Sequence, residues 1–155
     1  SQDEQLKAYH LAFAGPDEGM LRGLKHVVEA AGMNDRVHFT GYIGGDEKAD
    51  AYRAADFLII PSRQEAMSIV VLEAGITGTP VLITDRCGFD DVATVAGGMV
   101  VEASVDGLRE GLLAMAGNPA KLKIMGQNLK KLTREHFLWD QMANRHLELF
   151  AKITE

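Results

Sequence analysis

Short, largely apolar runs alternate with helical stretches along residues 10–101 of this 155-residue chain. Five such runs, each bounded by turn residues, lie at 10–14, 37–40, 57–60, 81–84 and, more weakly, 99–101. Continuous apolar runs of this length are typical of strands that are covered on both faces. Between them, residues 18–31, 46–55 and 68–77 carry apolar side chains at helical spacing, and the last stretch is apolar almost all round, which predicts a buried helix. Alternating strands and helices predict βαβ units in a parallel sheet.

No further strand is expected after residue 103. Residues 105–116, 120–137 and 139–153 have helical periodicity, and Gly117-Asn118-Pro119 is typical of one helix ending and the next beginning. We find no linker or repeat, and 155 residues with 46% hydrophobic content fit one domain. The sequence therefore predicts an α/β fold, a Rossmann-like parallel sheet with helices on both faces and a helical C-terminal cap, in a single domain over 1–155.

Composition and motifs exclude several classes of function. A single cysteine excludes a disulfide framework and a cysteine-rich zinc module. A net charge of −6 gives no electrostatic footprint for nucleic acid, and no apolar run reaches the ~18 residues of a membrane-spanning helix. The five histidines lack zinc-ligand spacing, and the glycine motifs for dinucleotide and P-loop binding are absent. We expect no metal, no cofactor, no nucleic-acid partner, no transmembrane segment and a cytoplasmic location.

Ligands of open parallel sheets bind beyond the carboxyl ends of the strands, which here are loops 15–19, 41–45, 61–67 and 85–91. Gly15 allows a sharp turn, and Asp17 can cap the next helix; a plain turn and a phosphate-binding turn both fit. Three glycines in 41–45 allow close approach to a flat ligand walled by Tyr42 and Ile43, although a flexible turn fits equally.

The third loop carries the clearest chemistry. Glu65 precedes the apolar helix of residues 68–77, and Glu73 lies inside it. The N-terminus of that helix offers unpaired N–H groups to an anion such as a pyrophosphate, while carboxylates accept hydrogen bonds from sugar hydroxyls. This combination fits a nucleotide-sugar; the alternatives are a helix-dipole contact for Glu65 and a salt bridge for Glu73. In the fourth loop, Asp91 can face the same cleft, and we expect Cys87 to be a small semi-buried residue rather than a nucleophile.

Several of these segments together resemble the donor-binding region of the group 1 (family 4) retaining glycosyltransferases. The matching residues are Pro61-Ser62, Glu65, Glu73-Ala74, Gly78, Pro80-Val81, Gly88, Ala14 to Glu18, Val37 to Gly41, Ala55-Asp56 and Phe137 to Trp139. The resemblance runs from about residue 10 to 150 and includes the family's E-x7-E motif. It implies one half of a GT-B fold, in which two Rossmann-like domains face across a cleft. The acceptor domain, the first βα unit and the basic residues that neutralise the diphosphate would lie outside this chain.

The resemblance also implies roles for individual residues. The donor sugar would contact Glu65 and Ser68, and the ribose would contact Glu73. The diphosphate would be bound by Ser68, Ile69, Val70 and Gly15, and the base pocket would be lined by Tyr42 and Ile43. No catalytic residue, metal or cofactor is implied, because the nucleotide-sugar is a substrate. The chain departs from the family pattern at Met67 and Ser68, which replace an aromatic residue and a glycine, at Cys87-Gly88 in place of a glycine pair, and at Asp91 in place of a glutamate.

The function implied is transfer of a hexose from a nucleotide-sugar to a glycan or lipid-linked acceptor by a longer protein, with this chain alone inactive. The segments 64–66, 72–74 and 87–88 are similar to lipopolysaccharide-core glucosyltransferases of bacteria, so the whole enzyme is expected at the inner face of the membrane. Two alternatives stay open: a non-catalytic Rossmann-like binding or regulatory module, and another GT-B enzyme such as a nucleotide-sugar epimerase.

Overall fold

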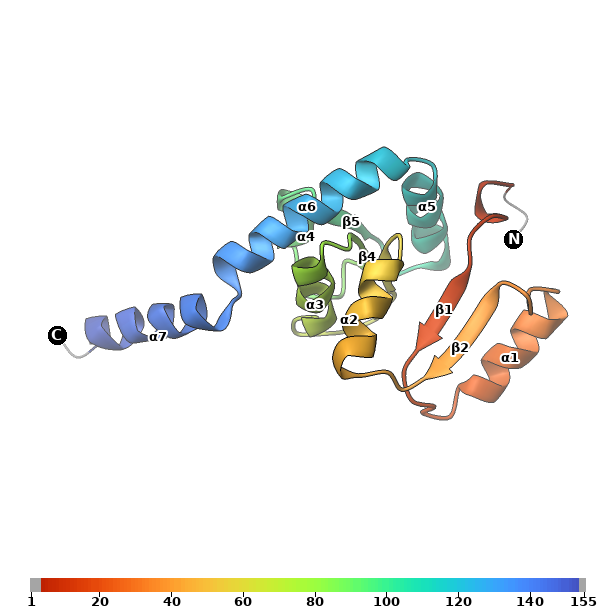
Figure 1. Ribbon diagram of the computed structural model, residues 1–155, viewed down its shortest axis with the longest axis horizontal. Coiled ribbons are helices and arrows are strands. Elements are labelled where there is room, and N and C mark those ends of the chain that lie inside the picture. The colour runs from red at the N-terminus through yellow and green to blue at the C-terminus, as the bar shows by residue number, and fades with distance from the viewer. Residues whose placement is uncertain (1–3, 154–155) are drawn as a thin grey trace. The chain divides into compact units, whose positions relative to one another are not determined.

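The computed structural model describes residues 4–153 (Figure 1). Contacts divide the chain into two compact units, residues 1–48 and 49–155. The predicted domain range of 1–155 includes residues 1–3 and 154–155, which lie outside the described residues.

The first unit is built on a pair of parallel strands. Its elements are η1 (Glu4–Leu6), β1 (Leu11–Ala14), α1 (Leu21–Ala30), β2 (Val37–Gly41) and the beginning of α2 (Gly45–Ala54). Within the sheet, Phe13 lies opposite Phe39, and their rings stack with centroids 5.2 Å apart. The Arg36 guanidinium donates to the backbone carbonyls of Leu6 and Lys7, which ties the N-terminal turn to the base of β2.

The prediction that the first apolar run is covered on both faces is wrong for the structure described. All four residues of β1 are exposed, and among the described residues of this unit Val37 alone is a buried hydrophobic residue. The physical reason is topological, since β1 pairs only with β2 and a two-stranded sheet encloses no core of its own.

The second unit holds a three-stranded parallel sheet in the order β3-β4-β5. Its elements after α2 are β3 (Leu58–Ile60), α3 (Ile69–Thr77), β4 (Val81–Thr84), α4 (Asp91–Thr94), β5 (Gly98–Val101), α5 (Val105–Ala116), α6 (Pro119–His136) and α7 (Trp139–Ile153). Every residue of the central strand β4 is buried. Successive side chains of a strand point to opposite faces, so Val81 and Ile83 enter one core cluster and Leu82 enters another.

Helices cover both faces of this sheet, as the sequence predicts. The cluster around Val81 contains residues of α2, α3, α4 and α6, whereas the cluster around Leu82 contains residues of α5 and α6. Asn118 caps α6 by accepting from the backbone N–H of Lys121 at 3.1 Å, which confirms the helix stop and restart at residues 117–119. This arrangement places the loops after β3 and β4 at one end of a well-packed sheet.

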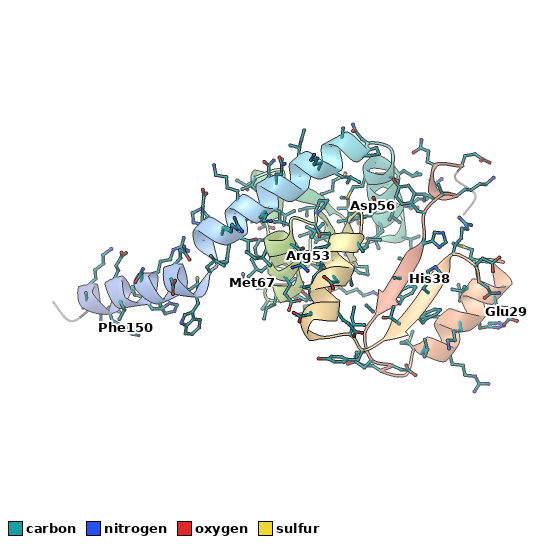
Figure 2. The ribbon with its side chains drawn as sticks, in the orientation of Figure 1. Glu29, His38, Arg53, Asp56, Met67 and Phe150 are labelled. Carbon is teal, nitrogen blue, oxygen red and sulfur yellow. The ribbon has the colours of Figure 1, made fainter. Side chains whose placement is uncertain are left out.

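Two helices are less buried than the sequence suggests. In α3, Val71, Ala74 and Gly75 are buried, but Ile69 at its N-terminus is 68% exposed. Helix α7 has the predicted bounds, yet none of its described residues is buried, and Phe150 projects from it into solvent (Figure 2). The short elements η1 and α4 were not expected from the sequence. Over the described residues, no helix has the length and apolar character needed to cross a membrane.

Candidate functional site

The loops that follow β3 and β4 are joined to each other at the carboxyl end of the sheet. The Thr84 hydroxyl donates to the carbonyl of Ser62 at 2.5 Å, and the backbone N–H of Glu65 donates to the carbonyl of Arg86 at 2.9 Å. Each bond connects a residue of one loop to the strand end or loop beside it. The third and fourth loops therefore form one continuous surface, as their position after neighbouring parallel strands predicts.

Gly88 allows these two loops to touch. Its φ of +61° lies in the left-handed region, and a Cβ added there would lie 2.2 Å from the carbonyl oxygen of Ala66. Only glycine fits both conditions. The neighbouring Cys87 is fully buried, with its Sγ 3.5 Å from the carbonyl oxygen of Ile60, so it is a core residue rather than an exposed nucleophile. Asp91 is exposed and begins α4.

The Glu65 carboxylate is held by its own loop. It is half-buried and accepts a hydrogen bond from the Ser62 hydroxyl at 2.5 Å. Because Ser62 is itself fixed through its carbonyl by Thr84, the carboxylate is positioned three residues before the N-cap of α3. Hydrogen bonds to a carboxylate are stronger than those between neutral groups, which favours one orientation of this side chain.

The N-terminus of α3 contains a buried hydroxyl without a partner. Ser68 is the N-cap and is 2% exposed, but its side chain makes no capping hydrogen bond, and its Oγ has no partner among the described residues. Its carbonyl accepts the N–H of Val71, which leaves the first-turn N–H groups of Ile69 and Val70 in the position where helices bind anions. An unpaired buried hydroxyl is costly and is usually explained by a ligand or water.

Glu73, one turn inside α3, accepts a hydrogen bond from the hydroxyl of Tyr52 at 2.8 Å. Burial and this hydrogen bond to Glu73 raise the pKa of Tyr52 well above its usual value of 10.0. The hydroxyl therefore stays a proton donor at neutral pH. Sequence reasoning missed Tyr52, because it lies 21 residues before Glu73 in a different helix and has the sequence signature of an ordinary core residue.

The remaining predicted residues belong to the first unit. There, the backbone N–H of Gly15 donates to the carbonyl of Gly41 at 2.9 Å, so the loops after β1 and β2 adjoin. Tyr42 is 78% exposed and Ile43 is half-buried. The structure thus brings Glu65, Ser68 and Glu73 together on α3 and its preceding loop. The roles of Gly15, Tyr42 and Ile43 stay predictions.

Asp17 organises the turn into α1. Its Oδ1 accepts the N–H groups of Gly19 at 2.7 Å and Leu21 at 3.1 Å, although the N-cap residue of the helix is Met20. The hydrogen bonds from Leu21 and Gly19 lower the pKa of this carboxyl. Asp17 therefore stabilises the beginning of the helix as an anion, close to the predicted capping role.

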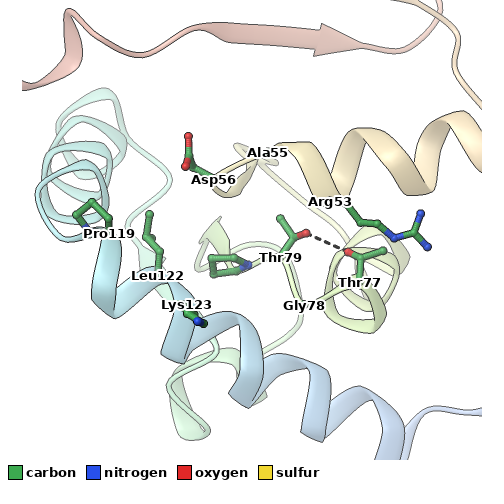
Figure 3. A pocket seen from close by; sticks show the side chains of 10 residues that line it. Arg53, Ala55, Asp56, Thr77, Gly78, Thr79, Pro119, Leu122 and Lys123 are labelled. Carbon is green, nitrogen blue, oxygen red and sulfur yellow. Dashed lines mark hydrogen bonds between the residues drawn. The ribbon is translucent and has the colours of Figure 1, made fainter.

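A hollow of about 450 Å³ in the second unit lies away from these loops (Figure 3). Its lining includes Asp56, which precedes β3, Thr79 and Pro80, which precede β4, and Lys123 of α6. These residues lie at the amino ends of the strands, whereas Glu65 and Ser68 follow a carboxyl end. The hollow is therefore separate from the candidate site.

Comparisons with known proteins agree with the predicted family. The family model described as "Glycosyl transferases group 1" matches residues 1–138. D-inositol 3-phosphate glycosyltransferase of Streptomyces avermitilis is 37% identical over 129 residues, which cover 83% of this chain and 25% of that protein. The chain spans between 18% and 33% of the length of the curated relatives that it matches.

Two solved structures show the same fold. WaaG, a glycosyltransferase involved in lipopolysaccharide biosynthesis, is 27% identical, with a TM-score of 0.75 over 88% of this chain and 36% of that chain. Anabaena Alr3699/HepE, solved in complex with UDP, has a TM-score of 0.82 at 16% identity, over 93% of this chain and 41% of that chain. Because the family model covers most of its length, the chain belongs to the group 1 glycosyltransferases.

Proposed function

We propose that this chain is the nucleotide-sugar-binding part of a longer retaining glycosyltransferase. The observation that carries the proposal is the buried, unpartnered hydroxyl of Ser68 at the N-terminus of α3. This hydroxyl and the N–H groups of Ile69 and Val70 are donors suited to a diphosphate, and the positive end of the helix dipole favours the same anion. In sugar transfer, negative charge develops on the departing nucleoside diphosphate, so these donors would stabilise the transition state as well as the bound donor.

The two glutamates supply the acceptors that a nucleotide-sugar requires on either side of its diphosphate. We assign Glu65 to the donor-sugar hydroxyls and Glu73 to the ribose. Glu65 precedes the helix N-terminus and Glu73 follows it by one turn, so the pair brackets the proposed diphosphate position along the chain. Carboxylates are acceptor-only groups with two oxygens each, which suits vicinal hydroxyls.

The rest of the enzyme would supply the acceptor site and the basic residues on the diphosphate. The similarity to WaaG, a glycosyltransferase involved in lipopolysaccharide biosynthesis, supports a bacterial cell-surface glycan or lipid-linked acceptor. HepE, which has the same fold, was solved with UDP and with UDP-glucose, and this supports a nucleoside diphosphate-hexose as the proposed donor. Because the acceptor domain would form the other side of the cleft, we expect the chain alone to bind the nucleotide-sugar weakly and to catalyse no transfer.

Calorimetric titration with UDP, GDP and ADP tests this proposal. We expect at least one nucleotide to bind with a dissociation constant in the millimolar range or below, and Glu73→Ala to weaken that binding while the thermal melt stays cooperative. Arg109→Ala, which changes an exposed residue of α5 that has no proposed role, serves as the control and should bind like the wild type. If none of the three nucleotides binds up to millimolar concentration, the proposal is wrong.

A further inference from the structure

Tyr52 links the last turn of α2 to the middle of α3. Its side chain is buried in the same core cluster as Val71 and Ala74, which are residues of α3. From there its hydroxyl donates to Oε2 of Glu73 at 2.8 Å. The phenol ring therefore reaches from the core to a carboxylate that is only half-buried. The ring is rigid and its hydroxyl is already hydrogen-bonded, so the side chain loses little conformational entropy when a ligand binds.

The backbone of Tyr52 is held as firmly as its hydroxyl. The buried hydroxyl of Thr79 donates to the Tyr52 carbonyl at 2.6 Å. Thr79 is in turn hydrogen-bonded to Thr77, oxygen to oxygen at 3.0 Å, and the Thr77 hydroxyl donates to the carbonyl of Ala74 at 2.7 Å (Figure 3). This series of bonds fixes the end of α2 on the C-terminal turn of α3. The position of the Tyr52 hydroxyl relative to Glu73 is thereby set from two sides.

We propose that Tyr52 is a positioning residue of the nucleotide site, which fixes the Glu73 carboxylate in the orientation that accepts the 2′- and 3′-hydroxyls of a ribose. The inference rests on the proposed function, because it takes the ribose as the ligand of Glu73. An ionised carboxylate has about four lone-pair sites, so one hydrogen bond from a tyrosine is compatible with further donors. A tyrosine can only donate to this carboxylate, which keeps Glu73 an acceptor for the ligand.

The protonation state of Tyr52 supports this role across neutral pH. Burial and the hydrogen bond to Glu73 raise the pKa of Tyr52, so the hydroxyl keeps its proton at neutral pH. Binding should therefore depend on the presence of the hydroxyl and not on its titration.

Binding of UDP and of 2′,3′-dideoxy-UDP to the 155-residue chain and to Tyr52→Phe tests the inference. The phenylalanine fills the same buried space and removes only the hydroxyl. Loss of the hydrogen bond that orients the Glu73 carboxylate should lower the affinity of Tyr52→Phe for UDP about tenfold, which corresponds to about 1.4 kcal/mol. Its affinity for the dideoxy analogue, which has no ribose hydroxyls for Glu73, should change less than twofold.

Two further variants make the result specific. Ser104→Ala removes the N-cap hydrogen bond of α5 and controls for loss of stability, so it should keep the preference for UDP over the dideoxy analogue. In a Glu73→Ala background, which leaves the Tyr52 hydroxyl no acceptor at position 73, Tyr52→Phe should have no additional effect on UDP. If Tyr52→Phe weakens both ligands equally, or changes neither, Tyr52 is a structural residue only and the inference is wrong, although the proposed function stands. If the wild type binds neither ligand, the proposed function fails and the inference fails with it.

Discussion

The position of Ser68 at the N-terminus of α3 is predictable from the sequence, whereas the environment of its side chain is not. Its position before an apolar helix predicts a helix N-terminus, and the structure places it there as the N-cap. What the sequence cannot predict is that the hydroxyl turns inward and finds no partner, because that depends on how the loops after β3 and β4 pack. The positions of Glu65 before this helix and of Glu73 inside it were predictable from the sequence, and their roles stay predictions. Tyr52 was not, since only tertiary packing brings α2 against α3.

Replacing Ser68 separates stability from binding. Ser68→Ala removes a buried hydroxyl that has no partner, so we expect the ligand-free chain to keep its stability or to gain about 1 kcal/mol. Nucleotide affinity should fall, because a diphosphate donor is lost. Thermal denaturation and titration of the same variant measure the two effects.

Ser104→Ala is the matched control at the N-cap of α5. There, Ser104 Oγ accepts the N–H of Gly107 at 3.0 Å, so its loss should cost about 1 kcal/mol, as N-cap replacements usually do. If Ser68→Ala destabilises the chain as much as Ser104→Ala does, the Ser68 hydroxyl is an ordinary cap and not a ligand donor.

Tyr52 should also give the chain a dependence on alkaline pH. Because its pKa is raised in the folded state above the unfolded value of 10.0, its contribution to stability is complete below about pH 10 and is lost as the pH rises beyond it. Urea unfolding between pH 8 and 11 should show this loss in the wild type and a flatter profile in Tyr52→Phe. Identical profiles would mean that the folded and unfolded chains bind the Tyr52 proton equally.

At the scale of elements, the strands of the second unit and the helices α5 and α7 could be predicted closely from periodicity alone. The run at 81–84 is continuously apolar because β4 is central and covered on both faces. The same pattern predicts a buried strand at β1, and this prediction is wrong because β1 is exposed in a two-stranded sheet. Apolar periodicity reports what a segment can bury. What it does bury depends on its neighbours, as the exposed apolar residues of α7 also show.

The contact of α3 with α6 depends on glycine. A Cβ at Gly126 would lie 2.0 Å from the carbonyl oxygen of Gly78, which is backbone and cannot rotate away. Overpacking of this kind typically costs about 1–3 kcal/mol, so Gly126→Ala should lower the unfolding free energy by that amount despite the better helix propensity of alanine. Gln127→Ala, at the next and exposed position of the same helix, should leave stability within about 0.5 kcal/mol of the wild type. Equal stability of the two variants in chemical denaturation would show that α3 and α6 are not in close contact at this point.

For the molecule as a whole, family membership rests on many weak matches spread over most of the chain. No single loop identifies the family, yet the family model matches residues 1–138. The prediction of helices on both faces of a parallel sheet is confirmed within the second unit. The pairing of the five strands in two sheets was not predicted, because strand order is set by packing that residue patterns do not encode.

The central claim, that the N-terminus of α3 binds the diphosphate of a nucleotide-sugar, is tested most directly by amide NMR shifts. Titration of the labelled chain with UDP and with UDP-glucose should move the N–H signals of Ser68, Ile69 and Val70 first, together with that of Glu65 for the sugar nucleotide. Inorganic diphosphate should move the same three signals less, because it lacks the ribose that Glu73 would bind. If nucleotide binding shifts other amides and leaves Ser68, Ile69 and Val70 unchanged, the diphosphate does not bind at α3 and the central claim is wrong.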